Sequence, residues 1–146
     1  MPPPPTLPDP TLRFLRTAWA LDHGLQSHSK RMKAQKGVTG PQRLVLRLLE
    51  LTPGAPPSEL ARALCLHKST VSVILRSLEH ARLVRRSPSA TDGRAVVLTL
   101  TPKGRRVVEQ RSGTVEAAFR ATLEKLPSRD VKIAQRVLEA LSVALA

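Results

Sequence analysis

The chain has 146 residues and a single cysteine, so it can form one compact domain but no internal disulfide and no cysteine-based metal site. Its 24 lysines and arginines outnumber 11 acidic residues, and the formal net charge of +13 predicts an acidic partner, with nucleic acid the first candidate. No apolar run reaches the length of a membrane span, and no glycine-rich phosphate loop is present. We therefore expect no membrane contact, no cofactor and a cytoplasmic location.

The first ten residues contain six prolines and no apolar segment typical of a signal peptide. We expect residues 1–10 to form an extended, disordered tail. A long helix is predicted to follow from about residue 11 to residue 33, with a polar linker up to residue 38. Its apolar stripe is formed by Leu12, Leu15, Trp19 and Leu25. Such a wide apolar surface predicts an N-terminal dimerisation helix over residues 11–38.

Trp19 and His23 lie four residues apart on this helix and face the same way. They could line a pocket for a small aromatic or phenolic effector. The alternative is that Trp19 packs in the core of a dimer while His23 stays partly exposed.

Three shorter helices are predicted next. Thr39 and Gln42 fit a capping box at the start of the first, which Pro53 and Gly54 end. The second covers residues 58–64, and a turn over residues 65–67 leads to the third at about residues 68–81. A lone cysteine is more often a small buried hydrophobe than a thiol sensor, so we expect Cys65 to be buried in that turn.

The helix over residues 68–81 has the pattern of a major-groove reader. Its inward stripe is formed by Val71, Ile74, Leu75 and Leu78. The outer side carries the candidate DNA-binding residues Lys68, Ser69, Thr70, Ser72, Val73 and Arg76. Short side chains let a helix approach base edges, and a lysine at a helix N-terminus suits a phosphate.

A hairpin is predicted directly after this helix, with strands at residues 84–87 and 95–100 and turn formers over residues 88–93. Arg94 stands at the base of the turn, where an arginine suits a narrow minor groove. Asp92 could fix Arg94 by an ion pair or cap the turn. Arg85 and Arg86 occupy adjacent strand positions and so face opposite sides, and we place Arg86 in the DNA-binding set.

The C-terminal part, residues 105–146, is predicted to be helical. One helix is expected from Pro102 to about Lys125, with an apolar stripe of Val108, Val115, Phe119 and Leu123. A second follows Ser128. The fold class is therefore mainly α with a small β wing: a winged helix-turn-helix over residues 39–104 between N- and C-terminal dimerisation helices.

The basic residues are concentrated in this winged region. Between Arg62 and Arg106 there are ten lysines and arginines against two acids, whereas the segment from Val107 to the end has six basic and five acidic residues. The concentration favours DNA contact over a merely solvated surface.

These features resemble the MarR family of bacterial transcriptional regulators. The matching segments are Ser58-Glu59-Leu60-Ala61, Lys68-Ser69-Thr70-Val71-Ser72, Leu78-Glu79, Leu83-Val84-Arg85-Arg86, Asp92-x-Arg94 and Leu100-Thr101-Pro102-Lys103-Gly104. The resemblance implies a homodimer whose recognition helices enter successive major grooves and whose wings reach the minor groove. It also implies a small-molecule or oxidant signal that changes the dimer geometry.

The chain departs from the family pattern at four positions. Arg82 and Cys65 stand where the family usually has glycine in the turns after and before the recognition helix. A non-glycine residue at positive φ costs on the order of 1 kcal/mol, so we expect the turn at Arg82 to differ. His67 replaces the usual Ser or Asp cap, and Val73, in place of a basic residue, could touch a thymine methyl.

We expect a sequence-specific transcriptional regulator, a repressor, that binds an inverted-repeat operator as a homodimer. Two other functions are alternatives to it. One is a winged-helix protein-interaction module, which would be expected to show more aromatic anchors than Phe14, Trp19 and Phe119. The other is a sequence-blind architectural DNA binder, which would need apolar wedges at the wing tip. The four histidines have no partners at ligand or triad spacing, so we do not expect an enzyme.

Overall fold

The computed structural model describes residue 1 and residues 6–146, in two compact units, Met1–Arg111 and Ser112–Ala146. Residues 2–5 of the predicted N-terminal tail lie outside the described residues. At its end, the Asp9 carboxylate accepts a hydrogen bond from the Thr11 amide at 2.7 Å and caps the first helix, which begins at Pro10.

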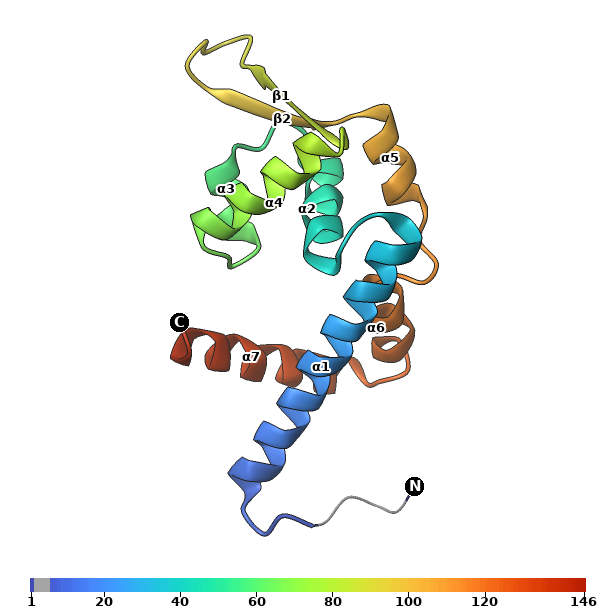
Figure 1. The fold of residues 1–146 in the computed structure, drawn as a ribbon. Helices are drawn as coiled ribbons and strands as arrows, with labels where there is room; N and C mark the ends of the chain where they lie inside the picture. The colour runs from blue at the N-terminus through green and yellow to red at the C-terminus, as the bar shows by residue number, and fades with distance from the viewer. Residues whose placement is uncertain (2–5) are drawn as a thin grey trace. The chain divides into compact units, whose positions relative to one another are not determined.

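The first unit is a winged helix preceded by a long helix (Figure 1). Its elements are α1 (Pro10–Lys36), α2 (Gly40–Leu51), α3 (Pro57–Ala63), α4 (Lys68–His80), β1 (Val84–Pro88), β2 (Val96–Leu100) and α5 (Pro102–Glu109). The two strands pair antiparallel, with Val84 opposite Leu100 and Pro88 opposite Val96. The predicted fold class is confirmed, and each predicted element up to β2 lies within a few residues of its observed position.

The core of this unit is apolar and draws on every element from α2 to α5. Its fully buried members include Val45, Leu46, Leu60, Val71, Leu75, Leu98 and Val108. The predicted capping box holds the start of α2, since the Thr39 amide donates to Gln42 Oε1 at 2.9 Å and the Gln42 amide donates to Thr39 Oγ1 at 3.3 Å. Gln42 Nε2 also donates to Ser77 Oγ at 2.8 Å and so ties α2 to α4.

The recognition helix α4 lies between two turns of the same kind. Cys65 after α3 and Arg82 after α4 both adopt the left-handed region, at φ 52° and 59°. In each turn two amides return to the helix: Leu66 to Ala61 and Cys65 to Arg62, then Leu83 to Leu78 and Arg82 to Glu79. These are Schellman motifs, which satisfy the last helical carbonyls. The expectation that the turn at Arg82 would differ is wrong, because these bonds and the burial of Leu78 and Leu83 hold the turn without a glycine.

The residues that follow β2 contact the residues that follow α4 at the Leu83 carbonyl. The Thr101 amide donates to it at 3.1 Å, and Thr101 Oγ1 donates to the Arg82 carbonyl at 2.7 Å. The same hydroxyl caps α5 by accepting from the Gly104 amide at 3.0 Å. Gly104 lies so close to Leu83 that a Cβ at residue 104 would overlap the Leu83 carbonyl oxygen. The end of α4, the start of β1 and the start of α5 therefore meet at one point.

A buried arginine joins α2 to α5. Arg43 is 1% exposed, and its guanidinium donates to the carbonyls of Val107 at 2.7 Å and Val108 at 3.0 Å. These carbonyls lie in the last turn of α5, where a cation is favourable because helical carbonyls there have no partner within the helix. Two carbonyls in the last turn of α5 are thus satisfied by a buried side chain.

The second unit contains α6 (Val115–Leu123) and α7 (Ser128–Ala144). The single helix predicted from Pro102 to about Lys125 is wrong, because α5 ends at Glu109 and α6 starts at Val115. The C-cap Gln110 leaves the helical region with ψ 85°, and Gly113 adopts φ 65° in the turn that follows. Thr114 Oγ1 then accepts from the Ala117 amide at 3.1 Å and begins a new helix.

Apolar side chains remain exposed on the outer helices. On α1 they are Leu12, Phe14, Leu15, Trp19 and Leu21, and in the second unit they include Phe119, Leu123, Leu138, Leu141 and Leu145. None of the described helices is both long enough and apolar enough to span a bilayer.

We predict that Gly104→Ala lowers the free energy of unfolding by about 1–3 kcal/mol, because the added methyl forces α5 away from the Leu83 carbonyl. Gly24→Ala on α1 is the matched control. A Cβ at residue 24 meets nothing within 4 Å, and alanine is the better helix former. Urea unfolding of both variants measures the difference. Equal stability of Gly104→Ala and the parent would contradict the close junction.

Candidate nucleic-acid interface

The outer face of α4 presents the predicted readers together. Lys68, Ser69, Thr70, Ser72, Val73 and Arg76 are all exposed, whereas Val71, Leu75 and Leu78 are buried. The Ser72 hydroxyl donates to the Lys68 carbonyl at 2.9 Å, so its lone pairs remain available to a donor. Val73 is 62% exposed, which is unusual for a β-branched apolar residue and leaves its methyl groups free for contact.

The start of α4 carries no side-chain cap. His67 stands at the N-cap position with φ −64° and ψ 144°, and its ring makes no capping hydrogen bond. The first amides of α4 therefore point outward without a side-chain acceptor, beside the exposed ammonium of Lys68. Such an end favours an anion such as a phosphate.

A shallow cavity of about 430 Å³ lies beside this end of α4. It is lined by Pro56, Ser58, Glu59, Arg62 and Lys68, and so brings the exposed Arg62 of α3 next to Lys68. Sequence reasoning counted Arg62 in the basic stretch but did not place it at the site. The only signal for it was its position at the start of that stretch, because nothing in the spacing shows that α3 turns this side chain toward Lys68.

At the wing tip, side-chain oxygens accept hydrogen bonds from the backbone amides of the turn. Asp92 Oδ1 accepts from the Arg94 amide at 3.0 Å, and the Ala95 amide donates to the Asp92 carbonyl at 2.9 Å. Ser89 Oγ accepts from the amides of Thr91 and Asp92. Of the two roles considered for Asp92, the structure shows the turn cap. Within the described part of the chain no ion pair joins Asp92 to Arg94, whose exposed guanidinium can meet a partner.

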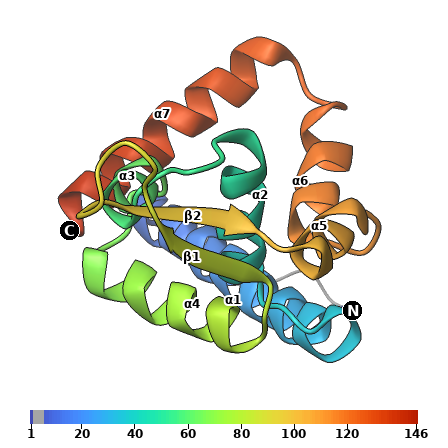
Figure 2. The same cartoon turned by 90° about the horizontal axis from the view of Figure 1, so that it is seen from above.

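The tip and the N-terminal end of α4 point toward the same side of the first unit, in both views (Figures 1 and 2). The two arginines of β1 differ in surroundings. Arg85 is opposite Thr99 and exposed, whereas Arg86 is opposite Leu98 and binds Glu79 of α4. The structure therefore brings the predicted residues of α4 onto one face, joins Arg86 to that helix, and places Arg94 at the far end of the strands.

The environment of Cys65 differs from the predicted one. Cys65 is exposed rather than buried, because the Schellman turn directs Leu66 inward in its place. Trp19 and His23 are both exposed on α1, with Trp19 66% accessible, and their effector pocket stays a prediction.

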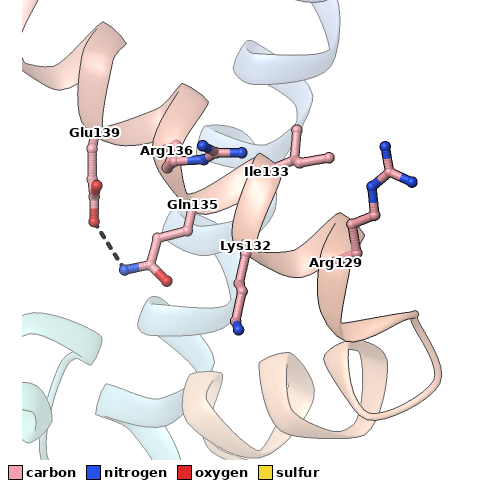
Figure 3. Close-up of a pocket in the computed structure, with 6 residues that line it drawn as sticks. All are labelled: Arg129, Lys132, Ile133, Gln135, Arg136 and Glu139. Carbon is pink, nitrogen blue, oxygen red and sulfur yellow. Dashed lines mark hydrogen bonds between the residues drawn. The ribbon is translucent and has the colours of Figure 1, made fainter.

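A larger open cavity of about 710 Å³ lies along α7 in the second unit. Its lining side chains project from one helix (Figure 3), and they are Arg129, Lys132, Ile133, Gln135, Arg136 and Glu139. Gln135 Nε2 donates to Glu139 Oε1 at 2.9 Å across this surface. No sequence prediction placed a site here.

A family model described as the MarR family matches residues 36–95, from the end of α1 to the start of β2. The HTH-type transcriptional repressor Rv2887 of Mycobacterium tuberculosis is 34% identical over 105 residues, which are 72% of this chain and 76% of that protein. The chain belongs to the MarR family. This is a family of transcriptional regulators and not of enzymes, in agreement with the sequence analysis.

Solved structures of MarR-type regulators share the fold. MepR of S. aureus in complex with DNA aligns with a TM-score of 0.74 at 22% identity, over 91% of this chain and 98% of MepR. PcaV of Streptomyces coelicolor, crystallised with its natural ligand, aligns with a TM-score of 0.75 at 20% identity, over 97% of this chain and all of PcaV. At these identities the likeness shows the fold of this MarR protein, including its wing.

Proposed function

We propose that this MarR protein is a sequence-specific DNA-binding repressor that binds an inverted-repeat operator as a homodimer in the cytoplasm. The observation that carries the proposal is the exposed outer face of α4, where short side chains lie between cations and beside an arginine-tipped wing. Short side chains permit the close approach that base reading needs, and the cations match the backbone. The repressor Rv2887 and the DNA complex of MepR support the same function.

The exposed apolar surface of α1, α6 and α7 supports the homodimer. Large exposed apolar surfaces usually mark an interface, and two-fold symmetry would present two α4 helices to two half-sites. The effector remains part of the proposal: Trp19 and His23 could contact a small aromatic or phenolic molecule, and the ligand complex of PcaV supports responsiveness to a small molecule.

We expect a duplex selected from a random library to contain an inverted repeat with half-sites about one helical turn apart, bound by two copies of the chain. Affinity should fall with salt at a log–log slope of roughly −5 to −9, because a dimer neutralises roughly six to ten phosphates. Quantitative titration over a salt series measures both. Equal affinity for all sequences would favour the architectural binder, and a flat salt dependence would favour the interaction module.

We propose separate roles for the two groups of residues on α4. Changing Thr70 or Val73 to Ala should alter the preferred sequence by about 1–3 kcal/mol at one or two base pairs, because these side chains face the bases. Changing Lys68 to Ala should weaken all sequences alike and lower the salt slope by about one unit per monomer, because it removes a phosphate contact. Comparison of selected site logos tests the assignment, and an unchanged logo for Thr70→Ala with a changed one for Lys68→Ala would reverse it.

We propose that Arg94 reads the minor groove from the wing tip. Arg94→Ala should weaken operator binding by about 1–3 kcal/mol and leave the melting temperature unchanged, since the guanidinium makes no ion pair with Asp92 in the described structure. Asp92→Ala is the matched variant, because it removes the turn cap and keeps the arginine. Full operator affinity of Arg94→Ala would contradict the minor-groove role.

A further inference from the structure

Glu79 and Arg86 connect the recognition helix directly to the wing. Arg86 Nε donates to Glu79 Oε1 at 2.9 Å, and Arg86 Nη2 donates to Glu79 Oε2 at 3.4 Å. The two contacts form a side-on fork between the end of α4 and the third residue of β1. Both side chains are partly exposed, Glu79 at 28% and Arg86 at 42%.

The strand register explains why Arg86 reaches α4. Arg86 is directly opposite Leu98, and opposed residues of an antiparallel pair project from the same face. Leu98 is fully buried, so this is the face of the hairpin that covers the helices. The preceding pair on this face, Val84 and Leu100, is also buried. Arg86 therefore adds a polar contact on a face that is otherwise apolar, since Leu98 opposite it is buried and Val96 in the next pair also packs on the core.

No second contact of this kind supports the outer part of the wing. Among the described residues, this pair supplies the only side-chain hydrogen bonds between α4 and the two strands. Beyond it, the hydrogen bonds of residues 89–95 lie within the turn itself. The wing is thus held at the Leu83 junction, by the Gly54 amide that donates to the Leu98 carbonyl at 2.9 Å, and by the packing of Leu98 and Val96 on the core. The Glu79–Arg86 pair adds the side-chain hydrogen bonds that come from α4 itself.

We propose that Glu79 is a positioning residue for DNA binding, which acts through Arg86 to hold the wing at the angle that lets α4 and Arg94 contact DNA together. The inference rests on the proposed function. A half-exposed ion pair adds little to the stability of a fold. It can nevertheless strengthen binding, because a wing already held in place loses less conformational freedom when the complex forms.

The test is Glu79→Gln, measured on the duplex that the parent protein selects. The substitution removes a negative charge close to the DNA-facing surface, so electrostatics alone would tighten binding. If Glu79 holds the wing, affinity should instead fall about three- to tenfold, with the salt slope not increased and the melting temperature unchanged. The double variant E79R R86E, which keeps the parental net charge, should recover affinity relative to R86E alone.

Glu50→Gln is the matched control. Glu50 forms an ion pair with Arg47 within α2, so the same charge is removed from a pair that lies within another helix. Its affinity should equal or slightly exceed that of the parent. Tighter binding of Glu79→Gln with a steeper salt slope would mean that Glu79 only competes with phosphate for Arg86, and would overturn the inference. An affinity of Glu79→Gln equal to that of the parent would overturn it as well. If the parent selects no sequence at all, the proposed function itself fails, and this inference with it.

Discussion

The carbonyl of Leu83 is the point on which the geometry of this MarR protein depends. The Schellman turn of α4 places Leu83 directly before β1. The Thr101 amide, just after β2, donates to the Leu83 carbonyl, and Gly104 of α5 packs against the same carbonyl. The end of α4, the start of β1, the end of β2 and the start of α5 are thereby fixed to one peptide group. Because α4 and both strands end there, a displacement of the helix must also displace the wing. For this reason we propose that the reading surface moves as one unit, and that the Glu79–Arg86 pair extends the same constraint outward along the hairpin.

Arg82 and Cys65 show what the fold requires of its sequence at the two turns around α4. Both adopt positive φ without being glycine, at a cost on the order of 1 kcal/mol each. The paired hydrogen bonds of each turn, and the inward Leu66 and Leu83, outweigh that cost. The backbone conformation is thus imposed by tertiary contacts and not by the local preference of the residue. The same turn leaves Cys65 at the surface, next to the start of the recognition helix.

The sequence was enough to predict the features that depend on local pattern. The capping box of Thr39 and Gln42, the inward stripe of α4 and the hairpin with its capped turn each follow from residues close in the chain. The break between α5 and α6 was missed, because apolar residues at Val108, Val115 and Phe119 continue a helical period across it and hide the signal of Gly113 and Thr114. The sequence also did not predict the contacts that join different elements. They involve Arg43, Arg62 and the Glu79–Arg86 pair, whose partners are distant in the chain or on another element.

We propose that α4 and the wing contact DNA as one unit in each half of a symmetric dimer. Hydroxyl-radical footprinting on the selected duplex tests it most directly, because it maps backbone protection on both strands at single-nucleotide spacing. We expect two equivalent blocks of protection at the major grooves of the half-sites, each followed outward by protection across the adjacent minor groove, where the wing would lie. Protection restricted to the major grooves, with the flanking minor grooves cleaved as in free DNA, would contradict it.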